Sequence, residues 1–113
     1  GLGYHFVINN GSGERDGTIE IGFRWQQQSS GTYLDGPGAD WFNSHAIGIC
    51  LIGDADTGRF SDSQLQELIW LVRRLQDRFG IPREAVYAQI GSDPHRVSPH
   101  FPDAWFRSTL LNR

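Results

Sequence analysis

The feature that most limits the possible folds of this chain is an unbroken apolar run, AIGICLIG, at residues 46–53. A run of this kind is typical of a strand that is buried on both faces of a sheet. We therefore predict that residues 46–53 form the central strand of a sheet. Ile49 and Leu51 are then covered by other side chains on both faces.

A long amphipathic helix is predicted after this strand. Ser61 and Gln64 have the spacing of a capping box, and Gly80 followed by Pro82 ends the helical pattern. Between these signals, apolar residues recur at helical spacing, namely Leu65, Leu68, Ile69, Val72, Leu75 and Phe79. This spacing predicts one apolar face, which we expect to pack against the sheet.

Shorter patterns predict four further elements, which are strands at 3–9, 18–23 and 85–90 and a helix at 103–111. Residues 24–45 show no clear period, so we predict a long loop there. The aromatic residues of this loop argue against disorder and favour a functional role. Strands and helices alternate, which predicts a single α/β domain over residues 1–113, with a mixed sheet flanked by helices.

Composition excludes several classes of protein. The chain has 113 residues, of which 38% are hydrophobic and 20% charged, as in a single globular domain. The net charge of −3 without a basic stripe argues against a nucleic-acid binder. No apolar run approaches the roughly 20 residues that span a membrane, and no signal peptide is recognisable. Because the chain starts with glycine and lacks methionine, we expect it to be part of a longer protein.

Several segments resemble the type-2 N-acetylmuramoyl-L-alanine amidases of peptidoglycan metabolism and the related peptidoglycan recognition proteins. They are GLGYHFVI at 1–8, DGTIEIG at 16–22, NSHAIGICLIGD at 43–54 and the helix and strand at 61–87. These segments occur in the family's order, and NSHAIGICLIGD is the most specific of them. The resemblance implies the amidase-like α/β fold without the family's N-terminal strand and helix.

The resemblance also implies where a zinc site would be. In the family, two histidines and a cysteine or aspartate hold zinc, which activates the water that cleaves the muramoyl–alanine amide. The first histidine would precede Gly1, and Gln89 and Ser98 stand at the second and third ligand positions. Neither is a good zinc ligand, so we expect no cofactor and no hydrolysis. His95 and His100 are the alternative ligands, in which case zinc would be the cofactor.

The remaining site residues are also implied by the resemblance. Tyr4 and Arg96 match residues that assist catalysis in relatives, and would be vestigial here. The predicted substrate-binding residues are Trp25, Tyr33, Asp40, Trp41 and His45. The aromatic rings among them either stack on sugars or hold the loop in place, and the sequence favours neither reading.

Three hypotheses follow for the function. The first is an amidase-like domain that binds peptidoglycan or muropeptides without hydrolysing them. The second is an active zinc amidase with an upstream or rearranged ligand, and the third is a structural or regulatory domain that binds a protein through residues 24–45. We further expect a partner chain or a missing N-terminal segment to cover an open sheet edge. The expected location is the cell envelope or another extracytoplasmic site.

Overall fold

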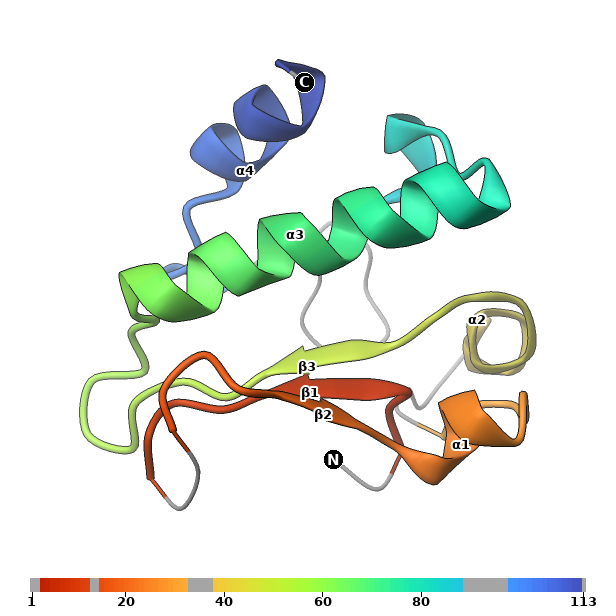
Figure 1. The fold of residues 1–113 in the computed structure, drawn as a ribbon, viewed down its shortest axis with the longest axis horizontal. Helices are drawn as coiled ribbons and strands as arrows, with labels where there is room; N and C mark the ends of the chain where they lie inside the picture. The colour runs from red at the N-terminus through yellow and green to blue at the C-terminus, as the bar shows by residue number, and fades with distance from the viewer. Residues whose placement is uncertain (1–2, 13–14, 33–37, 89–97, 113) are drawn as a thin grey trace.

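The computed structural model describes residues 3–12, 15–32, 38–88 and 98–112, and its strands form one mixed sheet (Figure 1). The sheet has three strands in the order β2-β1-β3, which are β1 (Phe6–Ile8), β2 (Ile19–Ile21) and β3 (Ile49–Leu51). β1 is antiparallel to β2 and parallel to β3. Together with the helices described below, this arrangement confirms the predicted α/β fold class.

The long helix α3 (Asp62–Phe79) covers one face of the sheet (Figure 1). Its start is the predicted capping box, in which Ser61 Oγ accepts from the Gln64 backbone N–H and Gln64 Oε1 accepts from the Ser61 backbone N–H. Gly80 ends the helix in the left-handed conformation (φ 65°), which glycine adopts without steric cost. Both helix boundaries predicted from the sequence are therefore confirmed.

The hydrophobic core lies between the sheet and α3. Side chains alternate between the two faces of a strand, and Phe6 and Ile8 of β1 both pack into this core. The helix supplies the opposite side with Leu68, Ile69, Leu71, Val72 and Leu75. The C-terminal helix α4 (Asp103–Leu111), predicted with the same bounds, adds Phe106 and Leu110.

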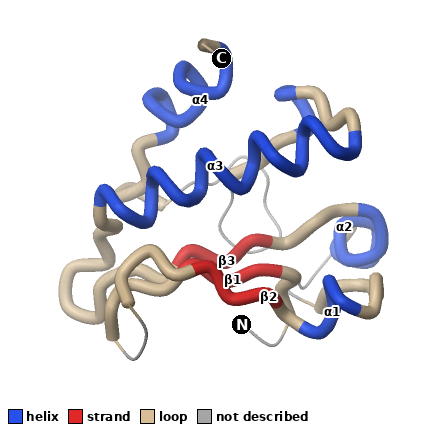
Figure 2. The backbone as a smooth tube through the Cα atoms, in the orientation of Figure 1, coloured by secondary structure: helices blue, strands red, loops and turns tan. Residues whose placement is uncertain are grey.

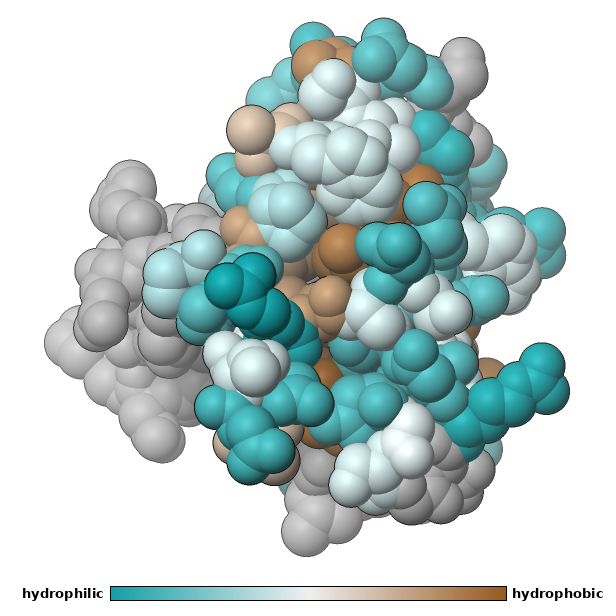
Figure 3. Space-filling view, turned by 90° about the vertical axis from the view of Figure 1, so that its left-hand side faces the viewer, coloured by the Kyte–Doolittle hydropathy of each residue, from teal (hydrophilic) through white to brown (hydrophobic). Residues whose placement is uncertain are grey.

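The side of the molecule on which α3 begins has a mostly hydrophilic surface. Apolar residues are visible between hydrophilic ones near the middle of this face (Figure 3). None of the helices described is both long and apolar enough to cross a membrane.

The prediction that residues 46–53 form the central strand is wrong for the strands described. β1 lies in the middle, with Phe6, Val7 and Ile8 all buried. β3 is the outer strand, and Ile49 and Leu51 are only half-buried. An apolar run indicates burial, but strand order depends on pairing between distant segments, which the run does not encode.

Two other predictions also differ from the structure. Residues 24–45 are not a continuous loop, because α1 (Phe23–Gln26) and α2 (Ala39–His45) lie at the end of the sheet where β1 and β3 begin (Figure 2). Such short helices cover too few residues to show a helical period. In place of the strand predicted at 85–90, a 3-10 turn η1 (Arg83–Ala85) is followed by residues 86–88 without strand structure. Residues 89–90 lie outside the described residues.

Ser61→Ala is expected to lower the free energy of unfolding by about 1 kcal/mol, the usual cost of losing an N-cap side chain. Ser61 Oγ also donates to Asp16 Oδ1 at 2.7 Å, so the substitution detaches the β1–β2 connection from the helix start. Urea unfolding followed by circular dichroism measures the change. Ser63→Ala, in the same helical turn and exposed, is the control and should cost less than about 0.5 kcal/mol. Equal losses in the two variants would contradict the role of the cap.

Candidate functional site

His5 organises the end of the sheet where β1 and β3 begin. Its Nδ1 accepts from the Gly48 backbone N–H at 3.0 Å, so the ring proton is on Nε2, which donates to the Ser29 carbonyl at 3.0 Å. The His5 backbone N–H donates to the Gly48 carbonyl at 2.9 Å. The buried histidine therefore ties β1 to the segment before β3 and to the turn after α1.

A small polar pocket of about 200 Å³ opens beside His5, between α1, α2 and the segment before β3. Its described lining residues carry imidazole, hydroxyl and amide groups and no carboxylate or guanidinium, and they include Gln28, Ser30, Asn43 and His45. Ser29 Oγ is buried here and has no hydrogen-bond partner among the described residues. The pocket is therefore suited to uncharged groups of a ligand that form hydrogen bonds, such as hydroxyls and amides.

An exposed aromatic pair stands on α2 at the rim of this pocket. The Trp41 and His45 rings are stacked, with centroids 5.0 Å apart and planes 11° apart, and His45 Nδ1 contacts the Trp41 carbonyl at 2.9 Å. The Trp41 side chain is 59% exposed. Asp40 is exposed in the first turn of the same helix. Three of the predicted substrate-binding residues are thus neighbours on one short helix.

Trp25 has a different environment from Trp41. Its ring packs on Phe6 at 5.0 Å and on Phe79 at 5.7 Å between centroids, so it joins α1 to the core. One side of the residue still lines the polar pocket. Tyr33, the remaining predicted substrate-binding residue, lies outside the described residues.

Tyr4 and Cys50 are both half-buried and remain protonated near neutral pH. Burial raises the pKa of the Tyr4 hydroxyl above its ordinary value, and the charge of the Cys50 thiolate raises it further. Burial also raises the pKa of the Cys50 thiol. Tyr4 is therefore a hydrogen-bond donor, and Cys50 lacks the thiolate character of a nucleophile or metal ligand.

The described residues do not supply a zinc donor set. Ser98 Oγ accepts from the His100 backbone N–H at 3.3 Å. The His100 ring lies against the turn after β3, where a Cβ on Gly58 would be 3.2 Å from His100 Cδ2. Over the described ranges, no three His, Cys, Asp or Glu side chains are grouped to hold a metal. The other predicted residues, Gln89, His95 and Arg96, fall in 89–97, outside those ranges.

Two features of the pocket were not predicted from the sequence, namely the backbone conformation of Gln28 and the burial of the Ser29 hydroxyl. Gln28 has a positive φ of 55°, uncommon for a residue other than glycine, and this conformation shapes the turn that presents Ser29. The only local signal is the polar run QQQSS at 26–30, which indicates a turn without indicating which side chain it buries.

Comparison with known proteins agrees with this architecture. The sequence model of a family described as N-acetylmuramoyl-L-alanine amidase matches residues 1–107. The endolysin of Klebsiella phage KP32 is 32% identical over 83 residues, which cover 69% of this chain and 47% of the endolysin. The endolysin of Escherichia phage T7 is 33% identical over 72 residues, which cover 59% of this chain and 40% of the endolysin.

The chain thus spans less than half the length of these two endolysins. The comparison with solved structures found no significant match. The family match nevertheless extends over nearly the whole chain and includes every strand of the sheet described above. The chain therefore belongs to the N-acetylmuramoyl-L-alanine amidase family.

Proposed function

We propose that this chain binds peptidoglycan fragments through α2 and the polar pocket beside it, without hydrolysing the muramoyl–alanine amide. The observation that carries the proposal is the exposed Trp41–His45 stack at the rim of a pocket whose described lining residues include no carboxylate or guanidinium. Family membership supplies the class of ligand, since amidases of this family act on peptidoglycan. Binding of this kind places the protein in the cell envelope or another extracytoplasmic site.

The chemistry of the two surfaces suits a glycopeptide. One face of a sugar ring presents C–H groups, and it packs against a flat exposed aromatic ring such as Trp41 with loss of apolar surface. Sugar hydroxyls and peptide amides then replace water at the serine and amide side chains of the pocket. The buried Ser29 hydroxyl gains a partner in the complex, which removes the cost of leaving it unsatisfied.

The proposed lack of hydrolysis follows from the side chains that are available as zinc ligands. Water needs a metal or a strong base to become a nucleophile near neutral pH, because its own pKa is about 16. Ser98, at the third family position, offers a hydroxyl that is a poor zinc ligand. Burial raises the pKa of the Tyr4 hydroxyl, so this group stays protonated and does not supply a base that would activate water.

Trp41→Ala is expected to weaken binding of a disaccharide muropeptide at least tenfold, because it removes the stacking surface; tenfold corresponds to about 1.4 kcal/mol. Isothermal titration calorimetry with the full chain measures the affinity. Trp105→Ala is the matched control, since Trp105 is also exposed but lies on α4, and it should leave the affinity unchanged.

The same preparation is tested for release of stem peptide from the muropeptide. Failure of the wild-type chain to bind muropeptide or purified peptidoglycan would overturn the proposal and favour a protein-interaction domain. Peptide release that depends on added zinc and disappears in His95→Ala or His100→Ala would instead support an active amidase with rearranged ligands.

A further inference from the structure

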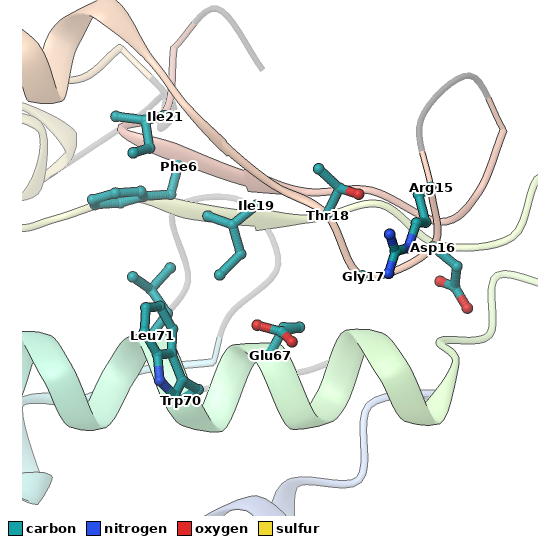
Figure 4. Close-up of a pocket in the computed structure, with 10 residues that line it drawn as sticks. All are labelled: Phe6, Arg15, Asp16, Gly17, Thr18, Ile19, Ile21, Glu67, Trp70 and Leu71. Carbon is teal, nitrogen blue, oxygen red and sulfur yellow. The ribbon is translucent and has the colours of Figure 1, made fainter.

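A second cavity, a groove of about 530 Å³, lies between β2 and α3 (Figure 4). None of the described residues lines both this groove and the polar pocket beside α2. Phe6, Ile19 and Ile21 line the groove from the strands, and Glu67, Trp70 and Leu71 line it from the helix; in Figure 4 the Ile19 side chain extends toward the helix. Ile21 and Trp70 are each 53% exposed, so apolar surface is open to solvent along this groove.

One side of the groove is an unpaired strand edge. The Asn9 backbone N–H donates to the Thr18 carbonyl, and the Gly22 backbone N–H donates to the His5 carbonyl, so even-numbered residues of this segment face β1. Successive residues of a strand direct their backbone groups to opposite sides. Ile19 and Ile21 therefore direct their N–H and C=O groups away from β1, where no described strand pairs with β2.

Ile19 and Ile21 thus have two properties. Their backbone groups point away from β1, and their side chains line the groove. A chain added beside β2 would pair with these backbone groups, and its residues opposite Ile19 and Ile21 would place their side chains over the groove. This combination of a free edge with an apolar groove is the geometry by which proteins bind extended peptides as an additional strand.

The charged side chains along this edge favour a peptide with basic residues. Glu20 is exposed on the opposite face of β2, and Glu67 lines the groove; neither forms an ion pair with another described residue. Among the described lining residues Arg15 is the one cationic side chain, and it lies at the hairpin end with Asp16 (Figure 4). The residue opposite Glu20 in an added strand would therefore be favoured as lysine or arginine.

The charge pattern also opposes pairing with a second copy of this chain. In the symmetric antiparallel register that sets Ile19 against Ile21 of the other copy, the two Glu20 carboxylates stand directly opposite each other. Like charges at such positions are destabilising. This register is therefore disfavoured for self-association, and the exposed Glu20 carboxylate favours a basic partner.

We propose that the β2 edge and its groove bind an extended segment of a partner protein in which apolar residues alternate with lysine or arginine. The apolar residues cover Ile19, Ile21 and Trp70, and a basic residue pairs with Glu20. The site is independent of the proposed peptidoglycan surface, so one protein is able to hold both ligands.

The probe for this site is the peptide acetyl-Thr-Val-Lys-Val-Lys-Val-Thr-amide with a fluorescent label, titrated with the full chain and followed by fluorescence anisotropy. We expect saturable binding that is weakened at least fivefold by Glu20→Arg and by Trp70→Ala. Replacing both lysines of the peptide with glutamate should weaken binding similarly, and Glu20→Arg should restore binding of that glutamate peptide. Glu84→Arg, an exposed substitution on η1, is the control and should change nothing.

The backbone contact is tested with methylated peptides. In an antiparallel pairing that sets valines opposite Ile19 and Ile21, methylation of the valine amides removes the donors that face β2 and should abolish binding. Methylation of the lysine amides, which face away in this pairing, should be tolerated. Circular dichroism confirms that each protein variant is folded.

Three results would overturn the proposal. They are no saturable binding at about 1 mM peptide, equal affinity for the lysine and glutamate peptides, and equal effects of methylation at valine and lysine. A dimer seen by analytical ultracentrifugation and removed by Ile21→Lys would also overturn it, because the edge would then belong to a second copy of the chain.

Discussion

Ile8→Ala is expected to lower the free energy of unfolding by about 3–5 kcal/mol, the largest loss of any substitution considered. Ile8 is fully buried, with 0% of its surface exposed, and lies in the middle strand, in one core cluster with residues of α3 and α4. Truncation removes apolar contacts on several sides and leaves a cavity that a sheet and two helices cannot easily close. Urea unfolding followed by circular dichroism and tryptophan fluorescence measures the loss.

Leu51→Ala on β3 is the matched control for this prediction. Leu51 is paired with Ile8 in the parallel register but is only half-buried, so its truncation should cost clearly less, about 2 kcal/mol. A loss for Leu51→Ala that equals or exceeds that for Ile8→Ala would show that β3, and not β1, is the centre of the core.

Gln64→Leu is expected to lower the free energy of unfolding by about 2–4 kcal/mol although it replaces a polar side chain with an apolar one. Gln64 is 1% exposed, and its Nε2 donates to the Ile52 carbonyl at 2.6 Å and to the Ile8 carbonyl at 3.4 Å. Its Oε1 accepts from the Ser61 backbone N–H at 2.9 Å. The Ile8 carbonyl also accepts from the Ile52 backbone N–H, so it keeps a partner after the substitution.

The loss is therefore attributed to two backbone groups, the Ile52 carbonyl and the Ser61 N–H, which would lose their Gln64 partner in a partly buried setting. Gln66→Leu is the control, because Gln66 is exposed on the same helix and should change stability by less than about 0.5 kcal/mol. If Gln64→Leu were neutral or stabilising, the hydrogen bonds of Gln64 would contribute less than the apolar burial that replaces them.

Gln64 and His5 have related roles at opposite ends of β1. Gln64 bonds to the chain where β1 and β3 end, and His5 bonds to Gly48 where they begin. A sheet with only three residues in each strand has few ladder bonds, so buried polar side chains that extend the pairing contribute strongly to its order. The His5 end of β1 also borders the polar pocket, which His5 lines together with Ser29 and His45.

The sequence by itself determined the elements whose signals are local. The capping box at Ser61 and Gln64 and the glycine at position 80 set both ends of α3, because these contacts lie within a few residues of each other. The same holds for the β1–β2 hairpin and for α4. The motif order was also sufficient to predict the family, which the match over residues 1–107 confirms.

Only part of the candidate site could be predicted from the sequence. Trp41 and His45 were predicted as separate residues of a loop. Residues four apart are neighbours only in a helix, so their contact could not be predicted without knowing that α2 is helical. The roles of Gln89, His95 and Arg96 stay predictions from resemblance, since these residues lie outside the described ranges.

Tertiary structure alone decided which strand is central, which side chains line the two cavities and which backbone edge is open. Residues 46–53 are the longer apolar run, yet β1 is the middle strand, because its position follows from simultaneous pairing with two segments distant in sequence. A pattern of apolar residues measures how much surface a segment must bury. It does not name the neighbours that bury it, and strand order and surface grooves depend on those neighbours.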